Sequence, residues 1–585
     1  MISSKKRYAR KDLLGWVFLG ISVLMLGKSL ALCVSNDIWY DELFTVGMIE
    51  HSYGELIAFT ARDVHPPLYY CVTKFIVDLC KLINPAVSTV AAAKAVSVLP
   101  YFILLLYSLT FIRGRFGWFP AGMFAFCVTA MPQLPAYTVE IRMYSWALLF
   151  VTASLLHAYG TITAGQERVK ARRLHGAALV LYGLAAAYTQ YFACVAVVMI
   201  YLYVLAVFLS RDRGRLREWC LWTAVSVAGY LPWIPSLIRQ MTAVHENYWI
   251  LPLTWRSLGG CVKFLLKPAF ANDRLNTVLA VVLFGAYVGV FAAYVMRYAA
   301  GRRARTVQPA ERQSAGAEAT QTNDMGTDRL ASEMMSFVIA CIASLGGLVL
   351  FGFAASMLLR PIFVYRYMIP AMGGFWLAFA LCLDGMLPPH GKVQSGGMLQ
   401  PDEGLQFTGQ SKDSGCRLTG RRFTGLAGAA IVILTAVIGL RDYRAFMGEE
   451  EYKILLMQDT KEALALIQPD DIMICNFDQV QAVTSYYIED TVESYLWGGT
   501  PETLIQEIIR PYDTAEETED ILALAQRAGA EGVNLWFLGS FNSREEIVAG
   551  WREAGLTVEE QGSFLLERYW FNLYTVSGKV LTASE

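Results

Sequence analysis

Residues 13–34 read LLGWVFLGISVLMLGKSLALCV, an apolar run whose only charged residue is Lys28. One helical span of a bilayer needs roughly 20 consecutive apolar residues, so this run predicts a transmembrane helix. The basic residues Lys5-Lys6-Arg7 precede it, as they would in a secretory signal peptide. The run is too long for the apolar part of a signal peptide and lacks a small-residue cleavage site, so we expect an uncleaved first span.

Comparable runs recur along the chain, which has 55% hydrophobic and 17% charged residues and a mean hydropathy of +0.39. This composition is too apolar for soluble domains of such length. The sequence therefore predicts an α-helical polytopic membrane protein with about eleven or more transmembrane helices. We expect the spans at 13–34, 88–111, 118–133, 138–162, 174–190, 191–209, 219–238, 277–298, 333–358, 363–386 and 424–440.

The loops between these runs alternate in charge. Every second loop carries lysine or arginine, for example Arg113 and Arg115 in one loop and Arg172-Arg173 in another. Because basic loops stay in the cytoplasm, we expect a plasma-membrane protein with a cytoplasmic N-terminus. Residues 35–87 and everything after 440 then lie outside the cytoplasm. Two inside segments, 301–331 and 388–423, are rich in Gly, Ser, Thr and Gln, and we interpret them as flexible linkers.

After residue 440 the sequence changes from long apolar runs to short alternating segments. The pattern predicts helices at 451–467, 501–510, 515–529 and 543–554 and strands at 471–476, 533–538 and 563–571. We therefore divide the chain into a transmembrane domain, 1–440, and a small acidic α/β domain, 441–585. We find no catalytic pattern in the second domain and interpret it as structural or as a part that orients an acceptor.

Several function classes are disfavoured by composition. The net charge of −1 and the absence of zinc-type Cys/His spacing argue against a nucleic-acid partner. The inside segments contain neither a P-loop nor a glycine-rich dinucleotide turn. The scattered cysteines indicate no disulfide framework.

The first outside loop concentrates ionisable residues in two clusters. The first is Asp37-Ile-Trp-Tyr-Asp41-Glu42, and the second is Arg62-Asp63-Val-His65-Pro66-Pro67. Residues 43–59 between them fit helices lying in the membrane interface. The proline pair favours the start of a helix and would hold His65 just before it. Asp41 has a simpler interpretation as a helix cap, but a cluster of charges beside a bilayer favours a functional site.

Other polar clusters lie at the outer ends of later spans. Each has an alternative interpretation as an aromatic belt with snorkelling arginine. Arg142 and Arg366 lie within apolar runs, where an unpaired guanidinium is costly, so we expect an anion such as a lipid phosphate to meet them. The clusters are Tyr137 to Tyr144 with Glu140 and Arg142, Tyr188 to Tyr191, Tyr230 to Trp233, and Arg360 with Tyr365-Arg366-Tyr367.

The Asp41-Glu42 pair, the string Asp63-Val-His65-Pro66-Pro67-Leu-Tyr-Tyr, Glu140-Ile-Arg142-Met-Tyr144 and Arg366-Tyr367 together resemble family 39 glycosyltransferases. That group has the GT-C membrane fold and includes the protein O-mannosyltransferases and the bacterial aminoarabinose transferases that modify lipid A. The resemblance covers roughly residues 13–385. The aminoarabinose branch has a lysine before its Pro-Pro that contacts the donor phosphate, whereas this chain has His65 there.

The resemblance implies an inverting hexosyl- or pentosyltransferase that moves a sugar from a polyprenyl-phosphate donor to an acceptor hydroxyl of a protein, lipid or cell-wall glycan. It assigns catalysis to the acidic pair, with Asp41 as the base; on a helix, Glu42 points about 100° away and would orient it. We assign the donor phosphate to His65, Arg142 and Arg366, and supporting roles to Asp63, Glu140, Tyr144 and Tyr367. A divalent cation is possible at Asp63, but the ligand set is incomplete.

Two alternatives come from other classes. A transporter or flippase of a lipid-linked substrate would place its ionisable residues at the bilayer midplane and often shows repeated halves. The charged motifs here lie at helix ends and in a loop, and we find no internal repeat. A scaffold that displays the C-terminal domain would need a single span only.

Overall fold

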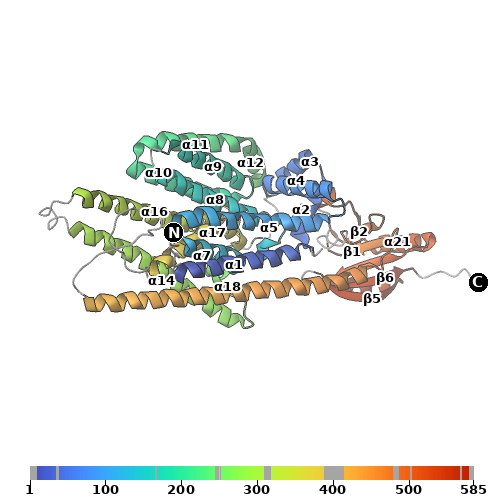
Figure 1. Ribbon diagram of the computed structural model, residues 1–585. Coiled ribbons are helices and arrows are strands. Elements are labelled where there is room, and N and C mark those ends of the chain that lie inside the picture. The colour runs from blue at the N-terminus through green and yellow to red at the C-terminus, as the bar shows by residue number, and fades with distance from the viewer. Residues whose placement is uncertain are drawn as a thin grey trace, which may run out of the picture.

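The computed structural model describes residues 10–34, 38–164, 168–243, 250, 252–307, 318–387, 414–477, 486–500, 503–566 and 569–578. It is an elongated helical bundle with an α/β domain at one end (Figure 1). Within the described residues, nine helical stretches are long and apolar enough to cross a membrane. They are Lys11–Leu32, Thr89–Phe116, Tyr144–Thr163, Tyr191–Arg211, Arg213–Thr242, Asp273–Arg302, Arg329–Leu358, Tyr365–Met386 and Thr424–Leu464. The expected polytopic architecture is confirmed.

Two expected spans, 118–133 and 174–190, are not among these nine stretches. Helix α7 (Trp118–Ala130) has 13 residues and is about 20 Å long, which is less than the roughly 30 Å of a bilayer core. Its residues are buried beside α1 (Arg10–Leu32), so it belongs to the bundle interior. Helix α9 (Val169–Ala187) begins with a basic turn and packs on α8 (Tyr144–Thr163).

The run at 138–162 was expected to be helical from its start, but α8 begins only at Tyr144. Residues 131–143 form a compact turn that contains a short 3-10 helix, Ala136–Thr138. Pro132 and Pro135 interrupt the helical hydrogen bonds here, and Gln133 has a left-handed φ of 71°. This turn brings Glu140 and Arg142 to the end of the bundle instead of burying them along a helix.

The expected linkers are helical wherever they are described. Helix α14 (Asp273–Val307) continues beyond residue 301, and α16 (Glu318–Leu358) begins before residue 331. In the second segment, α18 begins at Ser414, and residues 388–413 lie outside the described residues. The prediction of flexible linkers, which rested on a composition rich in small polar residues, is therefore wrong for the described residues of 301–331 and 388–423.

Helix α18 (Ser414–Leu464) joins the two ends of the molecule. Its 51 residues span about 75 Å, so the last expected span and the expected helix at 451–467 form one continuous rod across residue 440. It runs along the bundle and reaches the sheet, where it contacts β5 (Figure 1).

The C-terminal part contains a six-stranded sheet of order β3-β2-β1-β4-β6-β5. The first four strands are parallel, while β6 is antiparallel to β4 and to β5. The expected strand at 563–571 spans parts of the two strands of one hairpin, and β2 and β3 were not anticipated. The bounds are β1 Ile472–Cys475, β2 Glu493–Trp497, α20 Thr503–Ile508, β3 Asp513–Ala515, α21 Thr518–Glu531, β4 Leu535–Ser540, α22 Ser543–Glu553, β5 Thr557–Leu566 and β6 Tyr569–Ser577.

The first outside loop folds into α2 (Tyr40–Glu50), α3 (Tyr53–Arg62) and α4 (Leu68–Ile83). The C-terminal domain packs against this loop through α20. Arg62 forms a two-pronged ion pair with Glu507, at 2.9 and 2.5 Å, and His51 Nε2 lies 3.0 Å from the Ile508 carbonyl oxygen. A Cβ atom on Gly47 of α2 would lie 3.0 Å from the Ile508 backbone oxygen, so this contact requires a small residue.

The remaining helices complete the bundle around α8 and α17, the two most buried of the candidate spans. They are α5 Thr89–Tyr107, α6 Arg113–Phe116, α10 Tyr191–Arg211, α11 Leu216–Tyr230, α12 Ile234–Ala243, α13 Arg256–Leu266 and α17 Ile369–Met386.

Candidate active site

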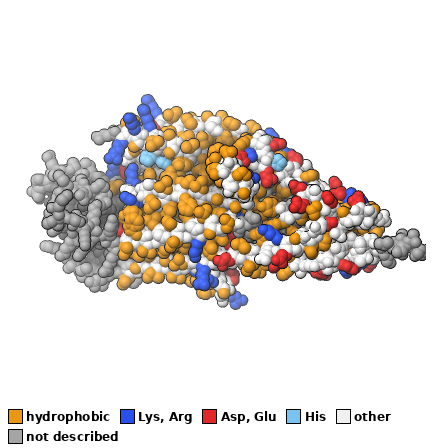
Figure 2. Space-filling model, turned by 45° about the vertical axis from the view of Figure 1, so that its right-hand side comes forward, with side chains coloured by type: hydrophobic (Ala, Val, Ile, Leu, Met, Phe, Trp, Pro, Cys, Tyr) orange, Lys and Arg blue, Asp and Glu red, His pale blue; other side chains and the backbone are white. Residues whose placement is uncertain are grey.

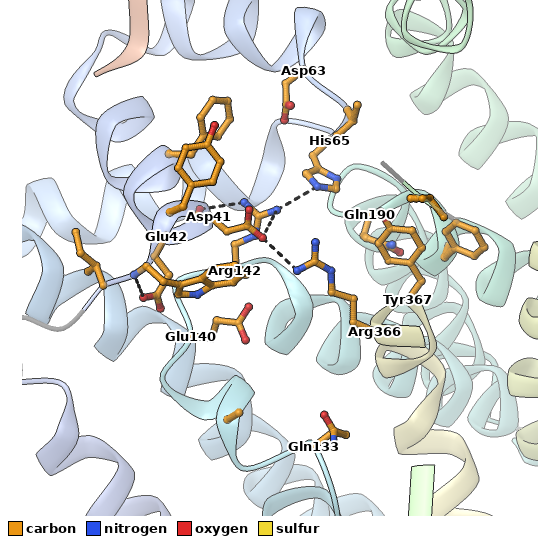
Figure 3. A pocket seen from close by; sticks show the side chains of 18 of the residues that line it. Asp41, Glu42, Asp63, His65, Gln133, Glu140, Arg142, Gln190, Arg366 and Tyr367 are labelled. Atoms are coloured by element: carbon orange, nitrogen blue, oxygen red, sulfur yellow. Dashed lines mark hydrogen bonds and ion pairs between the residues drawn. The ribbon is translucent and has the colours of Figure 1, made fainter. Parts of the chain in front are cut away.

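The first turn of α2 separates the roles of its two acidic residues. Glu42 is buried, and its carboxylate accepts hydrogen bonds from two backbone N–H groups, those of Trp39 (3.2 Å) and Ile141 (2.7 Å). It therefore caps α2 and ties this helix to the turn before α8. Asp41 instead turns its side chain toward two arginines (Figure 3). The simpler interpretation of Asp41 as the helix cap is wrong, because Glu42 makes the capping hydrogen bond.

Asp41 Oδ2 lies between Arg366, at 3.1 Å from Nη1, and Arg142, at 3.8 Å from Nη2. Arg142 is only 6% exposed, and its Nη1 donates to the backbone oxygen of Asp41 at 3.1 Å. The three residues come from α2, from the turn before α8 and from the start of the Tyr365–Met386 stretch. Three segments that are distant in sequence thus meet at one carboxylate.

His65 lies beside this group in a neutral form. Its Nε2 accepts a hydrogen bond from Arg142 Nη2 at 3.3 Å, because a guanidinium can only donate. Burial lowers the pKa of His65 well below its ordinary value, and the charges of Arg142 and Arg366 act in the same direction. His65 therefore orients Arg142 in this structure, and a cationic contact between His65 and a phosphate stays a prediction.

Two further carboxyl groups line the site in environments that favour the protonated form. Burial raises the pKa of Asp63 to about 6, although the nearby backbone N–H groups of Val64 and His65 and the Arg142 charge act in the opposite direction. Burial, together with the nearby Glu42, raises the pKa of Glu140 to about 8. Glu140, expected only as a supporting residue, thus has a pKa suited to proton transfer near neutral pH.

The two supporting tyrosines occupy different places. The ring of Tyr144 lies under Arg366, with the guanidinium carbon 5.8 Å from the ring centroid. Tyr367 stacks on Phe192 of α10 at a centroid distance of 4.8 Å. The first contact is made to Arg366 itself, and the second is made by the residue that follows Arg366 in the chain.

Several buried polar atoms at the site have no hydrogen-bond partner within the described residues. They are Asp63 Oδ2, Tyr70 Oη, Arg142 Nε and Tyr144 Oη. Buried polar groups are nearly always satisfied in folded proteins, so a group of unsatisfied atoms around one ion cluster indicates a place where a polar ligand binds.

These residues open into a cavity of about 1580 Å³ that is lined by both parts of the chain. Its wall includes Asp41, Glu42, Asp63, His65, Glu140, Arg142, Arg366 and Tyr367. Gln190, Tyr191, Tyr230 and Arg360 from the other predicted clusters also line it. Trp233 is not part of the lining, but its Nε1 donates to the Tyr191 hydroxyl at 3.1 Å.

Sequence reasoning missed other residues of this wall. Lys94 of α5 is the only charged residue between positions 88 and 111, so the argument applied to Arg142 and Arg366 would have found it. Glu450 and Tyr452 of α18 and Tyr569 of β6 also line the cavity. No sequence signal pointed to these three, because their position depends on how α18 carries the sheet to the bundle.

No group of three or more His, Cys, Asp or Glu side chains suited to a metal ion occurs in the part of the chain that the structure describes. Asp63, the residue considered for a divalent cation, has one carboxylate oxygen with no hydrogen-bond partner among those residues. The structure therefore gives no support for Asp63 as a metal ligand.

A solved structure shares this fold. The crystal structure of ArnT from Cupriavidus metallidurans bound to undecaprenyl phosphate aligns over 99% of this chain and 100% of that chain, with a TM-score of 0.54 and 12% sequence identity. The Archaeoglobus fulgidus oligosaccharyltransferase in complex with zinc and sulfate aligns over 94% of this chain and 72% of that one, at 11% identity and a TM-score of 0.39, which is too low to carry an argument.

Sequence comparisons found no matching family model and no matching curated protein. The likeness to ArnT is a likeness of fold, because the identity is low. The chain is a polytopic membrane protein with the GT-C fold and a C-terminal α/β domain.

Proposed function

We propose that this chain is an inverting glycosyltransferase that moves a sugar from a polyprenyl-phosphate donor to a hydroxyl group of an extracytoplasmic acceptor. One observation carries the proposal: the Asp41 carboxylate faces a large cavity and contacts two arginines from distant segments. A general base beside paired guanidinium groups is what transfer from a phosphate leaving group requires.

The distribution of charge supports an extracytoplasmic site. Lysine and arginine side chains gather at the end of the bundle opposite the C-terminal domain, and acidic side chains gather on that domain (Figure 2). By the positive-inside rule, the basic end faces the cytoplasm. Under this orientation the N-terminus is cytoplasmic, while the cavity and the C-terminal domain lie outside the plasma membrane.

In the proposed reaction, the acceptor oxygen bonds to the anomeric carbon while the bond from that carbon to the phosphate oxygen breaks. The phosphate leaves with the electron pair, and Asp41 takes the hydroxyl proton. Arg142 and Arg366 donate to the phosphate oxygens, since arginine forks match phosphate geometry. The unpartnered Arg142 Nε marks hydrogen-bonding capacity available for this purpose.

The lipid carrier is supported by the shared fold. The ArnT structure contains undecaprenyl phosphate, and we extend that class of ligand to this chain as a proposal. The motif resemblance to family 39 agrees with it. The acceptor stays open among a protein, a lipid and a cell-wall glycan, and the sugar is a hexose or a pentose.

Mass spectrometry of the envelope glycoconjugates tests the proposal. A strain lacking the gene should lose one sugar modification, and the wild-type gene should restore it. Asp41→Asn at equal expression should not restore it, whereas Asp78→Asn, which changes a half-exposed acid paired with Lys74 on α4, should restore it fully. An unchanged glycan profile after deletion would refute the transferase and favour the transporter alternative.

A further inference from the structure

Lys94 stands out among the cations of the cavity because it is buried and has no hydrogen bond or ion pair with the residues that the structure describes. It belongs to α5, has an exposed fraction of 3%, and lines the cavity. Removing an ammonium group from water is unfavourable unless a negative charge or hydrogen-bond acceptors compensate. A lone buried lysine that opens into a cavity therefore calls for an explanation.

The other cations of the cavity wall all have partners. Arg142 and Arg366 contact Asp41, Arg360 donates to the Met241 carbonyl oxygen, and Lys453 pairs with Glu450. Of the lysines and arginines lining the cavity within the described ranges, Lys94 alone lacks a hydrogen bond or an ion pair.

Two other partly buried lysines near the bundle, Lys11 and Lys74, have partners. Lys11 pairs with Asp384 at 2.9 Å, and Lys74 pairs with Asp78 at 3.2 Å and donates to the Ile49 carbonyl oxygen. The position of Lys94 is therefore not a general habit of this fold. The nearby Cys33 is a buried thiol, which behaves as a small apolar group and supplies no counter-charge.

We propose that Lys94 binds a phosphate or carboxylate group of a bound substrate, at a subsite of the cavity separate from the Asp41, Arg142 and Arg366 cluster. This inference rests on the proposed glycosyltransferase function. The separation follows from the contacts, because Lys94 forms no bond with any member of that cluster. An anion at Lys94 can come from two sources: the phosphate of the lipid carrier, or an acidic group on the sugar or the acceptor.

The first measurement is binding of undecaprenyl phosphate to purified full-length protein in nanodiscs. If the anion is the phosphate of the lipid carrier, loss of one charge-assisted hydrogen bond should weaken binding about 10- to 100-fold in Lys94→Met, with partial recovery in Lys94→Arg. Lys74→Met is the matched control, since Lys74 is also a lysine within a helix, α4, but does not line the cavity. It should bind normally.

The second measurement separates the two sources. Normal binding of undecaprenyl phosphate by Lys94→Met, with at least a tenfold loss of sugar modification in complemented cells at equal folded protein, assigns the anion to the sugar or the acceptor. Weakened binding of undecaprenyl phosphate assigns it to the lipid carrier. Normal binding and normal modification together would overturn the inference.

Thermal unfolding of the ligand-free protein distinguishes anion binding from a structural role. Replacing an unpaired buried charge by methionine should leave the melting temperature unchanged or raise it. A lowered melting temperature with normal ligand binding would make Lys94 structural and refute the proposal. If Lys94→Met does not fold, Lys94→Gln serves for the same measurements.

Failure of the Lys94 inference can be distinguished from failure of the proposed function. An inactive Asp41→Asn protein together with a fully active Lys94→Met protein refutes only the Lys94 subsite. An active Asp41→Asn protein refutes the proposed catalytic mechanism, whatever Lys94 does.

Discussion

Replacing Asp41 by asparagine separates catalysis from folding at this site. The substitution keeps the size of the side chain and leaves an amide oxygen that can still accept from Arg366, now at 3.1 Å from Oδ2. It removes the group that takes the proton. Loss of a general base lowers turnover by roughly 10²- to 10⁴-fold, which corresponds to about 3–5 kcal/mol of activation free energy.

The structural cost of the same change is smaller. Arg142, the buried partner, keeps its bonds to the backbone oxygen of Asp41 and to His65. Asp41 itself is 21% exposed, so part of the lost charge interaction is screened by water. We expect a loss of about 1–2 kcal/mol in the free energy of unfolding, within the ordinary range for single substitutions. That loss alters yield more than rate.

The assay uses proteoliposomes supplied with lipid-linked sugars and acceptors extracted from the source membranes, and it compares initial rates at equal amounts of folded protein. Glu42→Gln is the informative companion, because Glu42 holds backbone N–H groups and should affect stability more than rate. An Asp41→Asn rate within about threefold of wild type is too fast for a missing base and would refute the reasoning. An inactive Glu42→Gln beside an active Asp41→Asn would move the base by one residue.

Four other predictions concern different parts of the molecule. Arg366→Ala should weaken undecaprenyl phosphate binding about 10- to 100-fold and Arg366→Lys less, measured in nanodiscs; normal binding by both would leave Arg366 as a partner of Asp41 only. A single cysteine at Ala310 should resist a membrane-impermeant reagent in intact cells, and strong labelling there would reverse the topology. Because burial raises the pKa of Glu140 to about 8, the folded state holds a proton that the unfolded state releases from about pH 4.5, so stability should fall as pH rises through this window. Glu140→Gln should flatten that slope in thermal unfolding between pH 5 and 8.5; an identical slope would show that another group is responsible. Gly47→Val should lower activity by displacing α2 from Ile508, while an unchanged rate would show that docking of α20 does not position α2.

The membrane architecture could be predicted because it depends on local composition. Each span carries its own apolar run, and no distant contact is needed to recognise it. The errors lie where distant contacts decide. Pro132, Gln133 and Pro135 form a turn just ahead of the expected span 138–162, so α8 begins later than expected, at Tyr144. The composition of the segment 301–331 gave no sign that α14 and α16 extend into that segment.

The candidate site was predictable residue by residue, but its geometry was not. A charge within an apolar run is expensive anywhere, so Arg142 and Arg366 could be found without a structure. Whether Asp41 or Glu42 faces the arginines depends on the backbone of Ile141, which lies 99 residues further along the chain. The neutral state of His65 follows first from its burial and then from the charges of Arg142 and Arg366, and both depend on distant parts of the chain. Such contacts are long-range and leave no periodic pattern.

The placement of Asp41 between two arginines has a consequence for the proposed reaction. When the acceptor proton moves to Asp41, this side chain loses its charge, while the departing phosphate monoester gains one. The total charge of the site is thus conserved, and the negative charge only changes its position within the cavity. Arg142 and Arg366 contact the group that loses the charge, and the unpartnered Nε of Arg142 is available for the group that gains it.

Two flexible guanidinium groups can follow such a shift, because each has five donors in a planar fork and need not break every bond at once. A lysine at either position would have to leave Asp41 to reach the phosphate, since an ammonium group behaves as a single point of charge. Arg366→Lys should therefore reduce turnover more than it reduces affinity for undecaprenyl phosphate. Equal losses in both quantities would mean that Arg366 stabilises the bound phosphate but does not accompany the transfer of charge.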